Sequence, residues 1–274
     1  MLKTIEHTHP IFVSTAYQND IVAFNLVEVI KTSAKLIVSD EESFIVCSML
    51  FPTVPTWIWT ADNITAKQFT ALGDYLCNNF PNENGIYFVA KPEVATLLAK
   101  RFDNKNITSK YHIGMQSFEC PQVIPAKNQS ANIQKPTEQD VESLIPLCYN
   151  YFFNCFGREQ ASDELLKEAQ DFIGNKKAFV IKENSKIIAM AKSTRETDKH
   201  IAVNGVYTLP EYRNRGYAAA LVAHIAKLII SEGKTPLLYT DLSNPSSNKA
   251  YINVGFIERG RVDEIKLEWG SNNE

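Results

Sequence analysis

The chain has 274 residues, of which 45% are hydrophobic and 22% are charged, an ordinary composition for a globular protein. This composition excludes a disordered chain, a collagen-like repeat and a bundle of membrane spans. The formal net charge is −3, without the basic excess of a nucleic-acid-binding protein, so we expect no nucleic-acid partner. The first ten residues are polar and no apolar run reaches the length of a membrane span, so we expect a cytoplasmic protein with no membrane contact.

The cysteines are odd in number and show no CxxC spacing. We therefore expect reduced thiols, with no disulfide framework and no zinc ribbon. His7 and His9 have no third ligand nearby in the sequence, and we expect no metal site. The five cysteines are Cys47, Cys77, Cys120, Cys148 and Cys155.

A change in composition divides the chain into two parts. The stretch CPQVIPAKNQSANIQKPT, residues 120–137, holds three prolines and many small polar residues, which is typical of a linker. We therefore predict an N-terminal domain over residues 1–128, a linker over 129–136 and a second domain over 137–274.

Short strands and two helices are predicted before the linker. Thr65 and Gln68 form a capping-box pattern, and apolar residues at helical spacing then extend the helix to Asn78. The second helix has a proline near its first turn. β-Branched and aromatic runs predict strands at 35–39, 44–50, 57–59, 86–90 and 111–120, and the second helix covers 92–101.

The second part repeats the same order of elements. Thr137 and Asp140 form a variant cap for a helix to about Asn154, and a long helix follows Gly216 with apolar residues at i, i+3, i+4 and i+7. An internal duplication and coincidence both remain open explanations of the shared order. The other predicted elements are helices at 162–173 and 246–253 and strands at 178–181, 187–193, 201–208, 237–240 and 257–267.

The segment VYTLPEYRNRGYAAALV, residues 206–222, carries the first chemical signal. A strand ends at Thr208, and a turn leads into the long helix at Gly216. Free N–H groups and the positive dipole end at a helix N-terminus bind anions, and glycine lets the backbone approach a ligand closely. Arg213 and Arg215 add positive charge, so this loop suits a diphosphate. A plain turn with two solvated arginines is the alternative.

The segment LYTDLSNPSSNKAYINVGF, residues 238–256, follows the next strand. Asn244 and Ser246 can cap a short helix, and Tyr251 lies two turns after Asn244, so both residues can face the same side. Gly255-Phe256 then ends the helix and begins a strand. Alternatively, Tyr251 is a packed aromatic residue with a satisfied hydroxyl.

Together these segments resemble the GNAT superfamily of acyl-CoA-dependent N-acyltransferases. The motifs are Arg213-x-x-Gly216-x-Ala218 after a strand and Asn244…Ser247…Tyr251…Gly255-Phe256 about thirty residues later, and the clear resemblance covers about residues 137–268. It implies an α/β (α+β) fold of tandem GNAT-like domains, each a mixed, mostly antiparallel twisted sheet flanked by helices. The N-terminal half resembles a degenerate copy whose loop at 61–64 lacks arginine and glycine, so we expect no CoA site there.

The resemblance implies that acetyl-CoA lies where strands 201–208 and 237–240 splay apart. Backbone groups of Val206, Tyr207 and Thr208 would pair with pantetheine, and an N–H near Val206 would polarise the acyl carbonyl. Asn244 would help to hold pantetheine, with Ser247 and Asn248 as further candidates. Tyr251 resembles the general acid that protonates the leaving thiolate. The residues of the diphosphate loop would be Arg213, Asn214, Arg215, Gly216, Tyr217 and Ala218.

The implied reaction is direct attack of a primary amine on the thioester in a ternary complex. The strand 201–206 has no carboxylate to serve as base, Glu196 and Glu211 are weak candidates, and a water chain to solvent is the leading option. The acceptor would meet the first two helices of the second domain. Tyr149, Tyr151, Phe152, Phe153 and Phe156 there can form a pocket floor, but we favour a helix-core role.

The leading function is therefore an N-acetyltransferase that acts on a small-molecule or peptide primary amine. One alternative is an acyltransferase that uses a longer or aromatic acyl-CoA, for example on an amino acid. The other is a non-catalytic acyl-CoA-binding module, which would have no need of Tyr251. The N-terminal domain would be structural and would cover the acceptor or form a homodimer contact.

Overall fold

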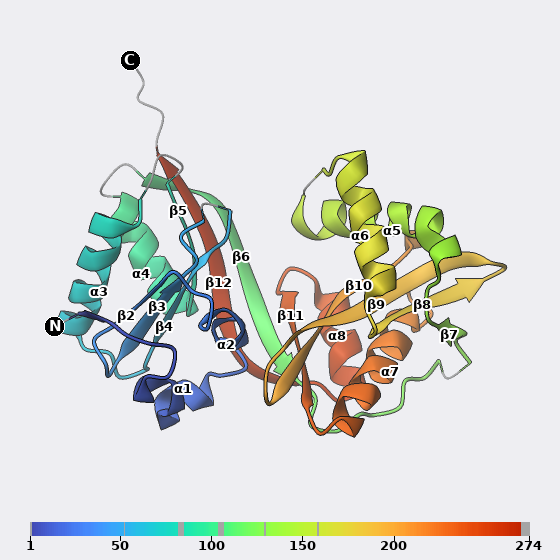
Figure 1. Ribbon diagram of the computed structural model, residues 1–274, viewed down its shortest axis with the longest axis horizontal. Coiled ribbons are helices and arrows are strands. Elements are labelled where there is room, and N and C mark those ends of the chain that lie inside the picture. Colours follow the sequence, from blue (N-terminus) through green and yellow to red (C-terminus); the bar gives the residue numbers. More distant parts are fainter. Residues whose placement is uncertain are drawn as a thin grey trace, which may run out of the picture. The chain divides into compact units, whose positions relative to one another are not determined.

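The computed structural model describes residues 2–51, 53–81, 85–103, 107–128, 130–157 and 159–269. The chain forms two compact units (Figure 1). Unit 1 comprises Met1–Ser117, Thr240–Ser243 and Glu258–Glu274, and unit 2 comprises Phe118–Tyr239 and Asn244–Ile257. The fold is of the predicted class, a mixed α/β architecture with a mostly antiparallel sheet flanked by helices.

These units divide the chain differently from the boundaries predicted at residues 128 and 137. The chain leaves unit 1 after Ser117, and the strand that follows α8 returns to it. That strand, β12 (Ile257–Trp269), pairs antiparallel with β5 (Ile86–Ala90) from Asp263↔Ala90 to Leu267↔Ile86. Amino-acid composition indicates which segment resembles a linker. It does not indicate which strand the last strand pairs with, because that pairing depends on residues far apart in the chain.

Unit 1 contains strands in the order β1-β2-β3-β4-β5-β12-β6. The β4–β5 pair is parallel, and the pairs β1–β2, β2–β3, β3–β4 and β5–β12 are antiparallel. Helices α3 and α4 bury Leu72, Leu76 and Leu98 against the sheet. The elements are β1 (Lys3–Thr4), α1 (Thr15–Asn19), α2 (Asn25–Ile30), β2 (Leu36–Ser39), β3 (Phe44–Ser48), β4 (Thr56–Thr60), α3 (Ala66–Asn79), α4 (Pro92–Asp103) and β6 (Ile107–Glu119), with a 3-10 turn at Pro10–Val13.

Unit 2 contains strands in the order β7-β8-β9-β10-β11. The β10–β11 pair is parallel, whereas the other three pairs are antiparallel. The elements are β7 (Ile133–Gln134), α5 (Val141–Phe156), α6 (Ser162–Gly174), β8 (Ala178–Glu183), β9 (Lys186–Glu196), β10 (His200–Thr208), α7 (Tyr217–Ser231), β11 (Thr235–Asp241) and α8 (Pro245–Val254), with 3-10 turns at Glu138–Asp140 and Pro210–Tyr212.

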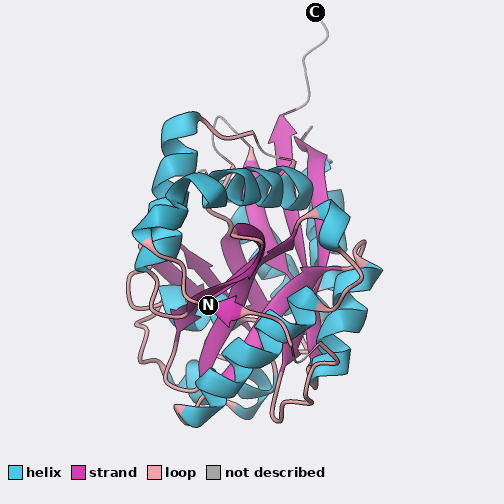
Figure 2. Ribbon diagram, turned by 90° about the vertical axis from the view of Figure 1, so that its right-hand side faces the viewer, coloured by secondary structure: helices cyan, strands magenta, loops and turns pink. Residues whose placement is uncertain are grey.

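Helices cover both faces of the unit 2 sheet (Figures 1 and 2). Phe179 and Ile181 of β8 pack with α7 and α8, whereas Ala178 and Val180 pack with α5 and α6. This alternation follows from the two-residue period of a strand, which sends successive side chains to opposite faces. The sheet is therefore buried on both sides, with α7 and α8 on one face and α5 and α6 on the other.

The local predictions agree well with the observed elements. The capping boxes Thr65–Gln68 and Thr137–Asp140 are both confirmed. The sequence analysis did not predict α1 and α2, which are short and lack a long apolar period. Among the described residues, no helix is long and apolar enough to cross a bilayer.

Candidate functional site

The two parallel strands of unit 2 are paired only at their first residues. The ladder runs from His200↔Thr235 to Ala202↔Leu237, after which β10 continues to Thr208 along β9 alone. The backbone of β10 beyond Ala202 therefore has one side without a described strand partner. Such an edge can pair with an extended ligand through main-chain hydrogen bonds.

A β-bulge interrupts β10 on this stretch. The register with β9 shifts between Asn204↔Lys192 and Tyr207↔Met190, so Gly205 and Val206 lie opposite one residue. Gly205 has φ +60°, a left-handed conformation that glycine adopts without a Cβ penalty. A bulge leaves a residue outside the ladder and re-aims the backbone. It lies where the sequence predicted an N–H near Val206 to polarise an acyl carbonyl.

The loop after β10 leads into the N-terminus of α7. Gly216 is the N-cap with φ +81°, and no side chain caps the first turn. The first N–H groups of a helix have no intrahelical partner, so Tyr217 and Ala218 begin an anion-attracting terminus. Tyr217 also bonds through its hydroxyl to Glu183, which fixes its ring beside β8.

The two predicted diphosphate arginines hold the loop itself. Arg213 donates from Nε to the Thr208 carbonyl at 3.1 Å and from Nη2 to the Tyr207 hydroxyl at 3.3 Å. Arg215 donates to the Glu211 carbonyl at 3.2 Å. Their charges lie beside the α7 N-terminus while their hydrogen bonds shape the turn. Asn214, between them, adopts a left-handed conformation with φ +64°.

A residue of the predicted N-terminal domain contacts this loop. The Asn128 side-chain amide donates to the Arg215 carbonyl at 2.9 Å. A Cβ placed on Gly216 would lie 3.3 Å from the Asn128 Cβ. Glycine at 216 is therefore favoured both by its positive φ and by this close approach. The sequence analysis missed the contact because the two residues are far apart in the chain.

Helix α8 carries the predicted acid. The Asn244 carboxamide oxygen accepts from the Ser247 N–H at 3.2 Å and from the Ser246 hydroxyl at 2.8 Å, and Pro245 occupies the first turn. Asn244 is therefore the predicted helix cap. This capping orients α8, so that Tyr251, two turns later, packs inward with 8% of its surface exposed.

The Tyr251 hydroxyl lies in a low-dielectric environment. Burial raises its pKa well above the ordinary value of 10, the nearby Tyr151 and Cys155 raise it further, and a hydrogen bond with Ser247 lowers it. The phenol therefore keeps its proton throughout the neutral range. Ser247, predicted as a pantetheine contact, is the hydrogen-bond partner of the candidate acid.

Three buried oxygen atoms in this region find no hydrogen-bond partner among the described residues. They belong to the side chains of Asn204 and Thr208 on β10 and Asn248 on α8. Unpartnered buried polar atoms are costly and call for a partner that the protein itself does not supply. Amide N–H groups of a pantetheine arm are donors of the required kind, so the residues fit acyl-CoA.

The aromatic residues of α5 contribute more than core packing. Burial and the charge of Cys155 raise the pKa of Tyr151, and a hydrogen bond from the Gly205 backbone and the charge of Arg195 lower it, with a net rise to about 12. Tyr151 therefore joins the β10 bulge to α5. The expectation of a core role overlooked this, although its aromatic run contained the signal. Phe156 has a side chain outside the described residues.

Neither predicted carboxylate candidate for the base faces the bulge. Glu196 bonds to Lys234, which lowers its pKa, and is about half exposed. Glu211 pairs with Lys186 at 3.1 Å on the surface. We assign no base to either residue.

The equivalent helix start in unit 1 is already occupied. Thr65 and Gln68 satisfy the first N–H groups of α3 through their capping box. In the preceding loop, Asp62 pairs with Lys91 at 2.5 Å. Self-capping and a carboxylate in this loop both oppose anion binding.

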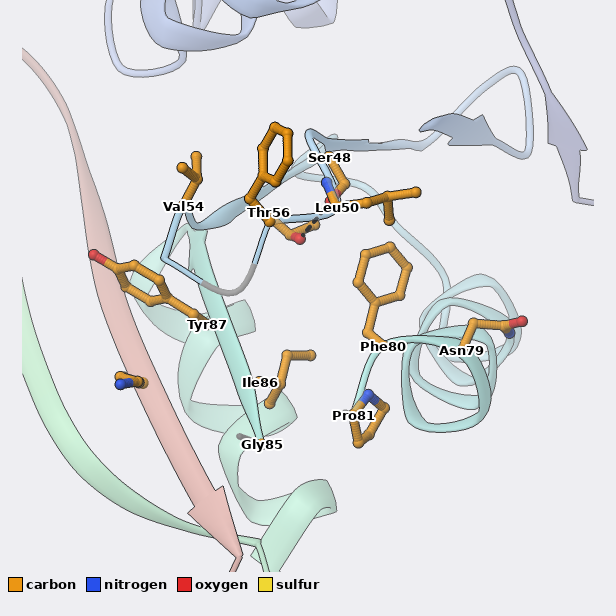
Figure 3. A pocket seen from close by; sticks show the side chains of 12 residues that line it. Ser48, Leu50, Val54, Thr56, Asn79, Phe80, Pro81, Gly85, Ile86 and Tyr87 are labelled. Atoms are coloured by element: carbon orange, nitrogen blue, oxygen red, sulfur yellow. Dashed lines mark hydrogen bonds between the residues drawn. The ribbon is translucent and has the colours of Figure 1, made fainter. Parts of the chain in front are cut away.

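Unit 1 contains a cavity of about 160 Å³ with a mixed polar and apolar lining (Figure 3). Leu50 and Phe80 point toward each other across it, and Ile86 and Val54 also line it. None of the predicted site residues borders this cavity.

The unit 2 site combines a free strand edge, a bulge and an uncapped helix N-terminus within a mixed α/β fold. Residues 142–256 match the model of the acetyltransferase (GNAT) family. No curated protein sequence matches the chain.

Solved structures share the fold over nearly the whole chain. A GCN5-related N-acetyltransferase from Sphaerobacter thermophilus has a TM-score of 0.65 at 13% identity and covers 98% of this chain and 96% of its own. A GNAT-family acetyltransferase from Colwellia psychrerythraea has a TM-score of 0.60 at 12% identity, covering 98% and 100%. One from Kribbella flavida has 0.57 at 14%, covering 95% and 98%. At these identities the similarity establishes the fold.

Proposed function

We propose that unit 2 is an N-acetyltransferase that transfers an acetyl group from acetyl-CoA to a primary amine. The observation that carries this proposal is the sequence of features along one strand. β10 parts from β11 after Ala202, bulges at Gly205 and leads into the uncapped N-terminus of α7 at Gly216. The bulge, the free edge up to Thr208 and the helix N-terminus follow one another along the chain in the order of the thioester, the pantetheine arm and the diphosphate of acetyl-CoA.

The donor would be held mainly by backbone groups. Val206, Tyr207 and Thr208 would pair with the pantetheine arm, and the loop from Arg213 to Ala218 would bind the diphosphate. The unpartnered Asn248 oxygen would accept from a pantetheine amide, while Asn244 would set the α8 position through its cap. Acetyl-CoA supplies the activated thioester, and the protein supplies position and polarisation.

The reaction requires one bond to form and one to break. The amine nitrogen attacks the thioester carbon, the tetrahedral intermediate collapses, and the carbon–sulfur bond breaks to give an amide and CoA. Orientation within a ternary complex supplies much of the rate. A backbone N–H at the bulge would stabilise the developing oxyanion, a contribution of about 3 kcal/mol where it is well aimed.

Two protons must move. Tyr251, kept protonated by burial, would donate its proton to the leaving thiolate, a role for which a group within hydrogen-bond reach contributes about 10²–10⁴-fold. The attacking amine loses its own proton through water to solvent, because the described β10 residues include no carboxylate. Tyr251 is then reprotonated from solvent after CoA leaves.

A charge substitution at the α7 N-terminus tests the donor site. Ala218→Glu places a carboxylate in the first turn, where the helix dipole favours it, so the variant should fold. The same carboxylate would repel a diphosphate. We expect calorimetry to show saturable acetyl-CoA binding by wild type and about 10- to 100-fold weaker binding by Ala218→Glu. Ala218→Gln introduces a side chain of similar size without the charge, and should therefore lose much less affinity for acetyl-CoA.

Each outcome separates the hypotheses. If wild type binds neither acetyl-CoA nor a longer acyl-CoA, the acyltransferase proposal is wrong. Binding of a longer acyl-CoA alone would favour the alternative donor. Binding with no release of free thiol in the presence of any amine, and no difference between wild type and Tyr251→Phe, would favour a non-catalytic acyl-CoA module. Tyr75→Phe in unit 1 is the control for Tyr251→Phe, because it removes a phenol hydroxyl outside the proposed site.

A further inference from the structure

Arg195 occupies an irregular position in β9. The register with β10 passes from Ile201↔Glu196 to Ala202↔Thr194, so Arg195 is left out of the ladder. Its φ is +52°, a left-handed conformation that is unfavourable for a residue with a side chain. A bulge of this kind re-aims one side chain, and sites of function are among the places where bulges and strained residues occur.

The Arg195 guanidinium lies over an aromatic ring of β11. Its Cζ lies 5.6 Å from the ring centroid of Tyr239, which belongs to β11 beyond the last paired residue. Its charge also lowers the pKa of Tyr151, whose hydroxyl meets the Gly205 backbone at the bulge. Arg195 is therefore close to the residues that surround the proposed position of the acyl group.

Arg195 has no carboxylate partner among the described residues, in contrast to Lys192 on the same strand. Lys192, on the same strand, pairs with Glu168 at 3.6 Å. No described carboxylate lies within ion-pair distance of Arg195, and its Nε is buried with no hydrogen-bond partner in the described part of the chain. A buried donor left unpaired costs about 1–3 kcal/mol. The cost is removed if a ligand supplies an acceptor.

The chemistry of the side chain selects the ligand. A guanidinium binds a carboxylate through two parallel N–H···O bonds, with geometry that a lysine cannot reproduce. A small acceptor must also bring an amine to the thioester at the bulge. One molecule that carries both groups is an amino acid.

We propose that Arg195 binds the carboxylate of the acceptor and that the acceptor is a free amino acid. This inference rests on the proposed acyltransferase function. The amine of the amino acid attacks the acyl carbon, and Arg195, stacked on Tyr239, holds its carboxylate away from the reacting centre. Arg195 is thus a specificity-determining residue that contacts substrate and transfers no proton.

The test compares acceptors that differ in one group. Acetyl transfer to an amino acid, to its carboxamide and to the corresponding decarboxylated amine is followed by CoA release at a pH where all three amines are partly neutral. For wild type we expect the amino acid to have the highest kcat/KM, by tenfold or more over the amide. Glycine and phenylalanine serve as small and aromatic series.

Substitution of Arg195 should lower the ratio of kcat/KM for the amino acid to kcat/KM for its amide. Arg195→Gln is expected to raise the KM for the amino acid by about 10- to 100-fold while changing kcat and amide kinetics much less. Arg195→Lys should recover part of the preference. Lys167→Gln removes an exposed cation from α6 and is the matched control, for which the ratio should not change. If Arg195 were purely structural, its substitution would reduce kcat/KM for the amino acid and for the amide alike.

The outcomes separate this inference from the function on which it rests. If wild type fails to bind acetyl-CoA in calorimetry, the proposed function itself fails. If wild type binds and transfers acetyl groups but prefers the amide or the decarboxylated amine, the amino-acid inference is wrong and the function stands. An equal fall in kcat/KM for all acceptors in Arg195→Gln also overturns the inference. The wild-type preference is decisive even if that variant does not fold.

Discussion

Gly255 ends α8 and packs against the backbone of the segment that contains Gln122 and Ile124, so its replacement by alanine should be strongly destabilising. It has φ +105°, and a Cβ there would lie 2.2 Å from the Gln122 carbonyl oxygen and 3.2 Å from the Ile124 nitrogen. The same segment is fixed to α8 by the hydrogen bond from the Ile124 N–H to the Val254 carbonyl at 2.8 Å. Backbone atoms on both sides leave the new methyl group no flexible side chain to displace.

The cost has two parts. A left-handed residue with a Cβ costs about 1–2 kcal/mol, and forcing an extra carbon into a packed site costs about 1–3 kcal/mol. Gly255→Ala should therefore lower the free energy of unfolding by about 2–5 kcal/mol. At about 2–4 °C per kcal/mol for chains of roughly this size, the melting temperature should fall by about 4–20 °C.

Gly233→Ala provides the matched control. Gly233 has φ +77° at the end of α7, and a Cβ there meets nothing within 4 Å. The variant should show only the backbone cost of about 1–2 kcal/mol. Thermal and urea unfolding of both variants measures the difference. If Gly255→Ala is no more destabilising than Gly233→Ala, the close approach to Gln122 does not constrain α8 and the reasoning is refuted.

Tyr251→Phe should slow turnover by about 10²–10⁴-fold while the affinity for acetyl-CoA stays unchanged. Because burial raises the pKa of Tyr251, the kcat of the wild type should show no loss from ionisation of this phenol up to pH 10. A fall in kcat below pH 10 that vanishes in the phenylalanine variant would contradict this. Gly205→Ala, with φ +60°, should distort the bulge and reduce kcat by about 10²-fold or more, measured beside an acetyl-CoA affinity that changes little; unchanged kcat would exclude the bulge from catalysis. Burial raises the thiol pKa to about 12 for Cys47 and about 11 for Cys120 and Cys148, so the unfolded chain ionises first. Stability is then complete below about pH 8 and should fall by about 1 kcal/mol per thiol by pH 10, and Cys148→Ala should reduce that slope in urea titrations at both pH values.

Much of the candidate site was accessible from local sequence. The strand ending at Thr208, the glycine turn at Gly216 and the cap at Asn244 are each a short-range pattern with a direct conformational cause. Hydrophobic period and turn chemistry act over a few residues, so they specify helices, strands and their ends wherever the pattern is long. The α7 N-terminus was predicted for the same reason.

The other site features depend on contacts between distant parts of the chain. Arg195 and Tyr151 lie some forty residues apart, and Asn128 reaches Arg215 across a longer separation. No local period distinguishes a core tyrosine from one that meets a bulge, nor an exposed arginine from one held beside an aromatic ring. The β9–β10 bulges that aim these side chains are mismatches of register, a property of two strands together.

The sequence by itself therefore determined the longer helices and most of the strands, the start of the loop with the character of an anion site, and the residues that cap its helices, because these depend on neighbours within a turn or two. The tertiary structure alone decided that β12 pairs with β5 in unit 1, that the chain leaves unit 1 at Ser117, and that Arg195 lies beside Tyr239. Those outcomes depend on which distant surfaces bury each other, and strand pairing is chosen by the whole hydrophobic pattern together with register.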